Sequence, residues 1–379
     1  MKQRTYDILN AGPRNRFMAS GVIVSNSSRG TNLQNLSRGG NIKTLLTAID
    51  DILNGADVDT IKMLHGAPLI VASEMLRPTF VAPKTHWMAR GDYSQIEARM
   101  LAWMAGEETV LQAFRDYDTI LGLDDKGKPI RKGPDIYRIS GSGICGVPPL
   151  ELTDQQRQLG KVGVLALGYA GGVGAFHNMA KIYGVKVSDE EALKIRDAWR
   201  ETNPNIVRLW HKTGNAAMNC MKGGPGTKEV IRPGMWFTRG KRVLVLRMPS
   251  GRSLTYWYPK IEKQKFSWGV QDSITCYSEN AVNKQFTKNN YYSGIFVQNA
   301  CQALARDVMA YALVNLEEDA LNPLLSVHDE ALCQVPKEMY PLANDAANAV
   351  TKSMMRQDSW CFGLPVAVDS SASDRYVKA

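Results

Sequence analysis

The chain has 379 residues, of which 44% are hydrophobic and 22% charged, a composition typical of a globular protein with two or three subdomains. Its formal charge of +9 favours a polyanionic partner. The six cysteines form no Cys-x-x-Cys pair, which argues against a zinc site or a disulfide framework, and the chain has no signal peptide and no apolar run of about 18 residues, so we expect a soluble, cytoplasmic protein.

Residues 1–26 form the first segment, and on their own they predict a short β-hairpin that ends at Asn26-Ser27. Residues 39–84 follow, with apolar side chains at amphipathic spacing, which predicts mainly helical structure. The spaced residues are Ile42, Leu45, Leu46, Ile49 and Leu53.

A strand and a helix are predicted to meet at Asp92. Residues 86–90 can run extended into this aspartate, and apolar residues recur at helical spacing over residues 96–104. Ser94 and Glu97 have the spacing of a capping box at the start of that helix. An aspartate at the carboxyl end of a strand suits a metal ligand, but a strand end beside a capping glutamate explains the same residues. Both interpretations stay open at this point.

Residues 105–150 are rich in glycine and are predicted to be mainly loop. Thr153 and Gln156 then predict a capping box that opens a helix. Two cations followed by an apolar and an aromatic side chain lie four residues apart along it, which suits a triphosphate with a base stacked beyond it. A solvated basic helix face is the plainer alternative, and the glycines of residues 168–172 predict a hinge. The four spaced residues are Arg157, Lys161, Leu165 and Tyr169.

Residues 221–297 contain a predicted β-hairpin at residues 243–252. Basic and aromatic side chains gather behind it and suit contacts with nucleic acid, although surface and core roles explain them equally well. These residues are Arg252, Tyr256, Trp257, Tyr258, Lys260, Lys263 and Lys265.

A second hairpin is predicted at residues 324–335, where two apolar runs surround a polar tip that contains Asp329. Neighbouring acids at an exposed turn are usually just solvated. Together with Asp92, however, Asp329 can hold two Mg²⁺ ions, because such sites use one or two carboxylates plus substrate phosphates and pairs of ions act in phosphoryl transfer. A final helix is predicted at residues 338–356.

Three segments in this order resemble the motifs of the family A (Pol I-like) DNA polymerases, phage members in particular. Residues 92–99 resemble motif A, residues 157–169 motif B and residues 327–330 motif C. The resemblance covers most of residues 27–379. Supporting segments are the template-primer segment at 32–36, the fingers segment at 135–137 and the Gln-bearing helix at 302–307.

The resemblance implies an α+β fold, with a right-hand polymerase palm made of an antiparallel sheet with helices, and helical fingers. The palm is expected at residues 27–105 and 221–379 and the fingers at about residues 106–220. The family's thumb and 3′–5′ exonuclease domain precede these segments, so we expect both to be absent and synthesis to be weak and distributive. The implied partners are primer-template DNA and dNTPs, the implied cofactor is a pair of Mg²⁺ ions, and the implied setting is a bacterial host infected by a phage or carrying a prophage.

The resemblance also assigns roles to single residues. Lys161 is expected to protonate the leaving pyrophosphate, and Glu97 with Tyr169 to crowd the sugar 2′ position so that ribonucleotides are excluded. The implied catalytic and metal-binding residues are Asp92, Tyr93 through its carbonyl, Lys161, Asp329 and Glu330. The implied nucleotide-binding residues are Glu97, Tyr137, Arg157, Lys161, Leu165 and Tyr169. The implied primer-template contacts are Asn32, Gln34, Asn35, Arg99, Gln302 and His328.

Residues 6–26, followed by Ser27, resemble the C-terminal end of an intein. In that family the terminal asparagine, here Asn26, cyclises and cuts its own peptide bond, and the hydroxyl of the next residue, here Ser27, acts as a nucleophile. The polymerase resemblance starts only at Ser27, after the place of the family's Gly-Arg pair. We therefore expect a split polymerase, whose separately encoded N-terminal half carries the other intein fragment and is joined by trans-splicing.

Several positions depart from the two families. Leu165 stands where Phe or Tyr is usual and Tyr137 where His is common, while Asn15 and Ser25 replace two histidines usual in inteins, which predicts slow or lost splicing. Two alternatives to a DNA polymerase remain: a non-catalytic nucleic-acid-binding remnant, and a single-subunit RNA polymerase that shares the palm chemistry. Glu97 and the residues of motif C, 327–330, favour a DNA polymerase.

Overall fold

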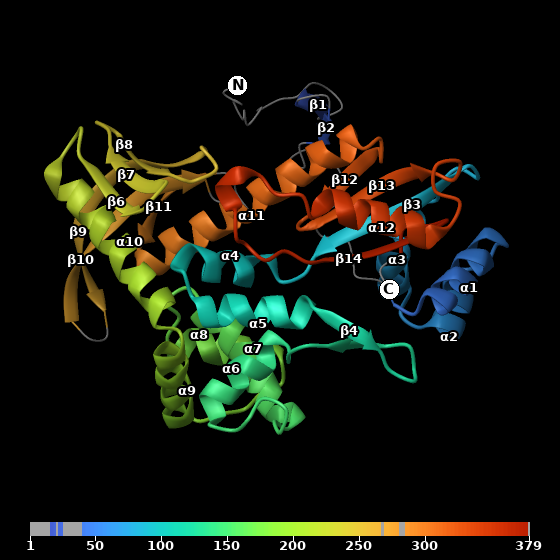
Figure 1. The fold of residues 1–379 in the computed structure, drawn as a ribbon, viewed down its shortest axis with the longest axis horizontal. Helices are drawn as coiled ribbons and strands as arrows, with labels where there is room; N and C mark the ends of the chain where they lie inside the picture. The colour runs from blue at the N-terminus through green and yellow to red at the C-terminus, as the bar shows by residue number, and fades with distance from the viewer. Residues whose placement is uncertain (1–15, 20–21, 26–39, 267–268, 280–284, 378–379) are drawn as a thin grey trace. The chain divides into compact units, whose positions relative to one another are not determined.

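The structure, a computed structural model, describes residues 16–19, 22–25, 40–266, 269–279 and 285–377. It combines helices with antiparallel sheets, which confirms the predicted α+β class (Figure 1). The chain divides into two compact units. Unit 1 comprises residues 1–94, 306–358 and 366–379, and unit 2 comprises residues 95–305 and 359–365. The expected palm and fingers boundaries stay predictions.

Unit 1 is built on a four-stranded antiparallel sheet in the order β12-β13-β3-β14. The predicted hairpin is confirmed as β12 and β13, and the predicted strand at Asp92 is confirmed as β3, which lies between β13 and β14. Residues 88–91 of β3 are buried on both faces, as expected of a central strand. The strands are β3 (His86–Tyr93), β12 (Pro323–Val327), β13 (Glu330–Pro336) and β14 (Val368–Ser373).

Helices complete unit 1. Helix α12 (Ala343–Met354) packs on β3 so closely that a Cβ at Gly91 would lie 2.9 Å from a methyl group of Val350. It begins five residues after the predicted start, since Pro341 offers no N–H to a helix. The helical prediction for residues 39–84 is confirmed by α1 (Ile42–Leu53), α2 (Val58–His65) and α3 (Pro68–Met75). Strands β1 (Arg16–Ala19) and β2 (Val22–Ser25) form the expected N-terminal hairpin.

The loop prediction for residues 105–150 is wrong, because this segment forms two helices and a hairpin. They are α5 (Glu108–Asp118), β4 (Ile120–Leu123), β5 (Pro129–Arg131) and α6 (Ile136–Cys145). The glycines on which the loop prediction rested have other structural roles. Gly127 lies in the turn of the β4–β5 hairpin, and Gly146 is the C-cap of α6 with a φ of 67°. Gly141 allows the next helix to pack closely against α6.

Helix α7 (Asp154–Leu167) opens with the predicted capping box of Thr153 and Gln156, which is confirmed. It ends before Tyr169, so this tyrosine lies in the following turn and not on the helix. The capping box predicted for α4 (Ile96–Ala105) is wrong. Its N-cap is Gln95, at a left-handed φ of 54°, because the chain turns directly out of β3.

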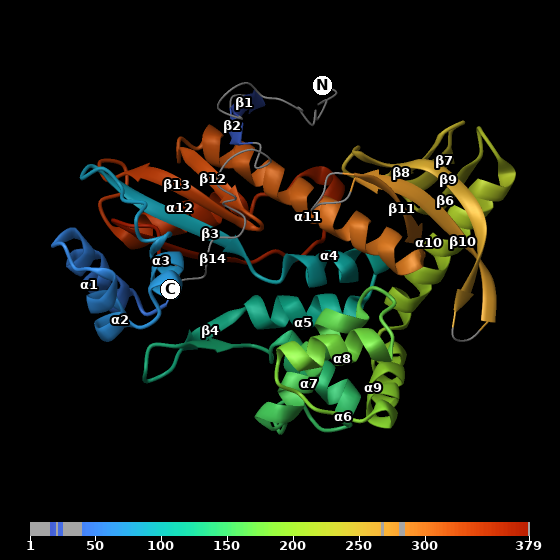
Figure 2. The ribbon, with the colours of Figure 1, turned by 180° about the vertical axis from the view of Figure 1, so that it is seen from behind.

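The rest of unit 2 consists of helices α8 to α10, the first part of α11 and a six-stranded antiparallel sheet in the order β11-β10-β9-β8-β7-β6. The predicted hairpin at residues 243–252 is confirmed as β8–β9. Figure 2 shows the long β9–β10 hairpin extending beyond its neighbours. The helices are α8 (Val173–Ile182), α9 (Asp189–Thr202), α10 (Pro204–Gly223) and α11 (Ser293–Glu318). The strands are β6 (Lys228–Arg232), β7 (Met235–Arg239), β8 (Val243–Arg247), β9 (Ser253–Phe266), β10 (Gly269–Glu279) and β11 (Phe286–Tyr291).

Gly160 is the residue at which α7 touches α6 backbone to backbone. A Cβ at this position would overlap the carbonyl oxygen of Tyr137 and lie 2.5 Å from the amide nitrogen of Gly141. We therefore expect Gly160→Ala to destabilise the chain by about 2 kcal/mol, because backbone atoms cannot move aside as a flexible side chain can.

Thermal unfolding followed by circular dichroism measures this effect. Gly174→Ala, in α8, is the matched control because nothing lies within 4 Å of its added Cβ. That change should leave the midpoint unaltered or raise it, as Ala favours a helix over Gly by up to about 1 kcal/mol. Equal midpoints for both variants would contradict the close contact.

Candidate active site

Asp92 and Asp329 lie side by side in unit 1. Asp92 is the penultimate residue of β3, directly opposite Glu330 on β13, and Asp329 occupies the tight turn that precedes Glu330. The N–H of Tyr93 donates to the carbonyl oxygen of Asp329 over 3.0 Å, which fixes the turn against the end of β3. Both aspartates are partly exposed. The sheet therefore brings the backbone positions of Asp92 and Asp329, which the sequence predicted as partners, next to each other.

The turn itself carries backbone strain. It has only two residues, since Val327 pairs with Glu330, and His328 adopts a φ of 55°. A two-residue hairpin loop favours positive φ, which suits Gly or Asn far better than His. Such strain persists where the surroundings hold it in place, and it is concentrated at functional sites. The geometry presents His328 at the exposed tip and Asp329 beside β3.

The donor set at this turn fits Mg²⁺. Two carboxylates and the Tyr93 carbonyl are hard oxygen ligands, and Mg²⁺ is commonly bound by one or two carboxylates with substrate phosphates completing its shell. Across the described ranges, no group of three or more His, Cys, Asp or Glu side chains is arranged to hold a metal.

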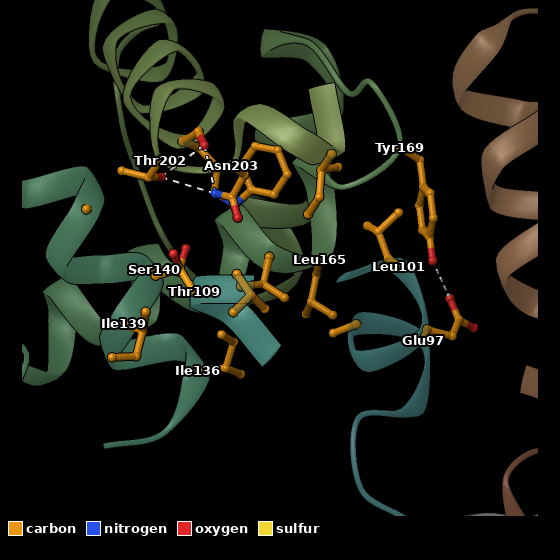
Figure 3. Close-up of a pocket in the computed structure, with 16 residues that line it drawn as sticks. Glu97, Leu101, Thr109, Ile136, Ile139, Ser140, Leu165, Tyr169, Thr202 and Asn203 are labelled. Atoms are coloured by element: carbon orange, nitrogen blue, oxygen red, sulfur yellow. Dashed lines mark hydrogen bonds between the residues drawn. The ribbon is translucent and has the colours of Figure 1, made fainter. Parts of the chain in front are cut away.

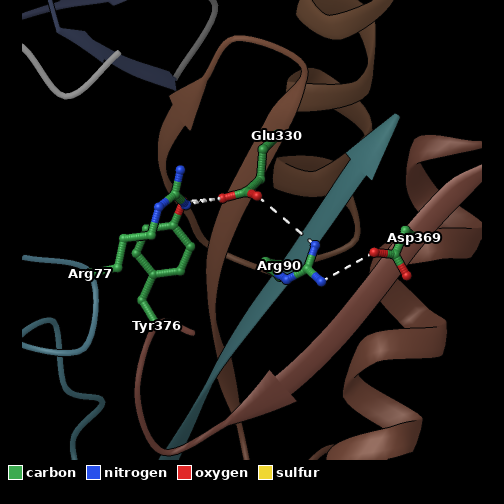
Figure 4. A network of polar contacts seen from close by, with 5 residues as sticks. All are labelled: Arg77, Arg90, Glu330, Asp369 and Tyr376. Carbon is green, nitrogen blue, oxygen red and sulfur yellow. Dashed lines mark hydrogen bonds and ion pairs between the residues drawn. The ribbon is translucent and has the colours of Figure 1, made fainter. Parts of the chain in front are cut away.

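Glu330, next to Asp329, belongs to a buried polar network (Figure 4). Arg77 Nη1 donates to Glu330 Oε1 over 2.8 Å, and the Tyr376 hydroxyl contacts both groups. Arg90 lies 3.9 Å from Glu330 and 3.2 Å from Asp369. The Arg77 and Glu330 side chains are only 5% and 3% exposed. Sequence reasoning missed Arg77 and Tyr376, because no spacing pattern connects residues that lie 253 and 46 positions from Glu330.

The predicted triphosphate residues come together in unit 2. Arg157 and Lys161 on α7 both lie over the ring of Tyr137, at 5.5 and 5.8 Å from its centroid. Asp135, which caps α6, accepts a 3.0 Å hydrogen bond from Arg157 Nε and so orients it. The structure thus places the two cations and Tyr137 in one cluster.

The residues predicted to exclude ribonucleotides also meet. The Tyr169 hydroxyl donates to Glu97 Oε2 over 3.2 Å, and Gln302 Nε2 lies 3.5 Å from Glu97 Oε1. Burial, reinforced by Cys301 and Glu97, raises the pKa of Tyr169 far above its usual value, so the hydroxyl keeps its proton. Glu97 therefore serves as an acceptor for Tyr169 rather than as the helix cap predicted from the sequence.

A cavity of about 280 Å³ lies beside this pair in unit 2 (Figure 3). Glu97, Leu165 and Tyr169 line it together, so three of the predicted nucleotide-binding residues share one cavity. The remaining lining is mainly apolar and comes from α4, α5, α6, α7, α9 and the start of α10. It includes Leu101, Val110, Ile136, Ile139, Val164, Trp199 and Ile206.

Arg99 is placed in the interior. Its side chain is 0% exposed, its guanidinium forms two hydrogen bonds with Asp118 at 2.5 and 2.9 Å, and it lies 4.3 Å from the centroid of the Phe114 ring. The predicted contact of Arg99 with DNA therefore has no support in this geometry. Asn26, Ser27, Asn32, Gln34 and Asn35 lie outside the described residues.

The chain is similar to known DNA polymerases. Residues 25–222 match the family model of DNA polymerase family A. The chain is 32% identical over 331 residues to the DNA polymerase of Bacillus phage SP02, covering 86% of this chain and 47% of that protein. It is 24% identical over 284 residues to the DNA polymerase of Mycobacterium phage D29, covering 74% of this chain and 34% of that protein.

A solved structure shares the fold. The POL domain of Pol1 from M. smegmatis, in complex with DNA primer-template and dNTP, superimposes with a TM-score of 0.51 at 18% identity, covering 93% of this chain and 46% of that one. The chain spans less than half the length of each of these relatives. Because the family model matches more than half of its residues, the chain belongs to DNA polymerase family A.

None of the helices in the described part of the chain combines the length and apolarity that a bilayer-crossing segment needs.

Proposed function

We propose that the chain carries the nucleotidyl-transfer centre of a DNA polymerase and catalyses template-directed DNA synthesis. The observation that supports this proposal is the proximity of Asp92 and Asp329: Asp92 lies opposite Glu330, and the hydrogen bond from the Tyr93 N–H to the Asp329 carbonyl holds the turn against the end of β3. A non-catalytic remnant has no chemical need for two adjacent carboxylates at a strained turn. Membership of DNA polymerase family A indicates the type of reaction, which is nucleotidyl transfer.

Asp92, Asp329 and the Tyr93 carbonyl are the groups that would hold Mg²⁺. When bound, a pair of these ions supplies activation of the primer 3′ hydroxyl and neutralisation of charge on the triphosphate. The protein's own task is to hold the two carboxylates at fixed positions. Glu330 is a positioning residue in this proposal, because its ion pair with Arg77 holds the first residue of β13 opposite Asp92.

Arg157 and Lys161 bind the triphosphate by charge and hydrogen bonding. Their common contact with Tyr137 keeps the two cations near each other before a nucleotide arrives, which lowers the ordering that binding requires. Lys161 also donates a proton to the leaving pyrophosphate oxygen. The proposed contacts to primer-template DNA are Asn32, Gln34, Asn35, Gln302 and His328.

Primer extension tests the proposal. The full chain, a labelled primer on a longer template, Mg²⁺ and either dNTPs or rNTPs are incubated, and products are resolved by denaturing gel. We expect extension with dNTPs only. Extension that prefers rNTPs would favour an RNA polymerase, and no extension, also after addition of a thumb-containing polymerase half, would favour a remnant.

Glu97→Ala should raise incorporation of rNTPs relative to dNTPs by about a hundredfold, on the scale by which shaped pockets discriminate. The reason is that Glu97, held by Tyr169, fills the space that a sugar 2′ hydroxyl needs. Single-turnover incorporation of one nucleotide gives the ratio. Glu108→Ala, at a glutamate with a 70% exposed side chain, is the control. An unchanged ratio in Glu97→Ala would remove this residue from sugar selection.

We further propose that residues 1–26 and Ser27 take part in protein splicing. Two observations support it: the hairpin β1–β2 directly precedes Asn26, and the family A match starts at residue 25. The Ser27 hydroxyl attacks the carbonyl that joins the upstream polymerase half to its intein fragment, so that an ester to Ser27 forms and the bond to that fragment breaks. Asn26 then cyclises and cleaves the Asn26–Ser27 bond, and the ester shifts to the freed Ser27 amine as a peptide bond.

Intact-mass spectrometry tests the splicing proposal. The chain is coexpressed with an N-terminal polymerase half that ends in an intein fragment. The expected product is a ligated polypeptide that lacks residues 1–26 of this chain, and Asn26→Ala should prevent its release. Absence of any ligated product at all temperatures and times tested would contradict splicing while leaving the polymerase proposal intact.

A further inference from the structure

Four aromatic side chains gather on β9, β10 and β11, the three strands on one side of the six-stranded sheet in unit 2. Trp257, Tyr258 and Phe286 are 46%, 45% and 51% exposed, and Tyr277 is half-buried between them. Ring centroids lie 6.4 Å apart for Trp257–Tyr258, 6.2 Å for Tyr258–Tyr277 and 6.0 Å for Tyr277–Phe286. We call these four residues the aromatic row. Large aromatic side chains clustered at a surface mark interaction sites more often than scattered ones do.

Backbone strain creates part of this row. Successive residues of a strand normally point to opposite faces, yet Trp257 and Tyr258 are both exposed while Tyr256 and Pro259 are buried. A β-bulge explains this, because the register shifts between Thr275 and Tyr277 on the facing strand. Tyr258 has a φ of 48°, which is rare for an aromatic residue, and its N–H donates to the Arg242 carbonyl. Strained residues of this kind occur where a side chain must point in a particular direction.

Positive charge surrounds the aromatic row. Residues 228–291 contain twelve Lys and Arg but only four Asp and Glu, so this segment of 64 residues carries a formal +8 of the chain's +9. Exposed cations flank the rings on the same strands and on the β7–β8 turn. They include Lys241, Arg242, Lys260 and Lys288. Lys288 lies directly opposite Tyr277, although it also pairs with Glu262.

The opposite face of this sheet is occupied. Phe237 and Tyr256 pack edge-on against Phe296 of α11, with centroids 5.2 and 4.9 Å apart. The aromatic row is therefore not needed for the core of unit 2. It also lies beyond residue 222, where the match to the family model ends. Neither folding of the sheet nor the polymerase motifs explain it.

We propose that the aromatic row and its flanking cations bind single-stranded DNA. Exposed rings stack on unpaired bases without regard to sequence, and flanking cations follow the phosphates. Duplex DNA does not suit this surface, because its bases are already stacked on each other. The role goes beyond the proposed nucleotidyl transfer: the surface would hold an unpaired strand, such as a template overhang, on the protein.

The test is fluorescence anisotropy of 5′-labelled (dT)20 titrated with the full chain in EDTA, so that no catalysis takes place. We expect Trp257→Ala and Tyr258→Gly each to weaken binding about tenfold, the scale of one base–aromatic stack. Tyr258→Gly is informative because Gly tolerates the left-handed backbone, so the sheet stays folded. Phe362→Ala, at an aromatic residue 86% exposed outside the sheet, is the matched control and should bind like the parent.

Three further comparisons decide the outcome. The double change of Lys260 and Lys288 to Gln should lower the salt slope of binding by about 1.4, from about 0.7 per phosphate contact on single strands. If Trp257→Ala and Tyr258→Gly weakened binding of duplex DNA as much as binding of (dT)20, the single-strand assignment would be overturned. If the parent chain bound (U)20 more tightly than (dT)20, the choice of DNA would be overturned. Binding of (dT)20 by Trp257→Ala/Tyr258→Gly within twofold of the parent would overturn the proposal. This readout is independent of whether the chain extends primers.

Discussion

Asp92→Asn and Asp329→Asn should each lower the rate of primer extension by a thousandfold or more, a loss of about 4 kcal/mol of transition-state stabilisation. Each change keeps the size and shape of the side chain but removes the negative charge that a hard cation requires. In the proposed mechanism the two carboxylates act on the same reacting phosphate, so the double variant should be little slower than either single variant. Single-turnover extension by one nucleotide gives the rates.

A matched control separates loss of the site from loss of the fold. Asp374 in unit 1 has a 69% exposed side chain and pairs with Lys337 at the surface over 2.8 Å. Asp374→Asn should extend primers within about twofold of the parent, since exposed ion pairs contribute little. The assignment of Asp92 and Asp329 would fail if either variant kept more than a tenth of the parent rate while melting at the same temperature.

Arg77→Met is expected to destabilise the chain by about 3–5 kcal/mol, as is typical when one partner of a buried ion pair is removed. The change leaves the Glu330 carboxylate, which is 3% exposed, without its 2.8 Å ion-pair partner. Glu330→Leu should show a loss of similar size. Urea unfolding followed by circular dichroism gives the free energies.

The double variant Arg77→Met/Glu330→Leu distinguishes an ion pair from independent packing. We expect it to lose much less than the sum of the two single losses, because no buried charge then lacks its partner. Lys132→Met serves as the surface control: its 2.8 Å pair with Asp116 has a 54% exposed lysine, and the change should cost less than about 1 kcal/mol. Additive losses at Arg77 and Glu330 would show that the two groups do not interact.

Local patterns predicted much of this fold. The strand at Asp92, the hairpin at Asp329 and the capping box at Thr153 are all confirmed, because each depends on residues close together in the chain. The prediction for residues 105–150 was wrong because glycine was interpreted only as a loop residue. Gly141 instead serves the contact of two helices, a reason that appears only when both helices are in place.

The candidate site was predictable in its main residues but not in its supports. The motifs identified Asp92 and Asp329, whereas the surroundings of Glu330 come from Arg77 and Tyr376, which lie far away in the sequence. Glu97 shows the same limit. Its spacing from Ser94 predicted a cap, but the long-range hydrogen bond with Tyr169 determines its actual partner. Side-chain partners that depend on tertiary packing leave no periodic signal.

The glycine contact between α6 and α7 has a mechanical consequence. Gly160 lies against the backbone of Tyr137 and Gly141 with no side chain between them, so nothing can yield at this point of the interface between the two helices. We therefore expect α6 to follow a movement of α7, so that Arg157 and Lys161 stay close to Tyr137. In the proposed reaction, bending during nucleotide binding would then fall outside this pair of helices, and the cluster of Arg157, Lys161 and Tyr137 would move as one preassembled body.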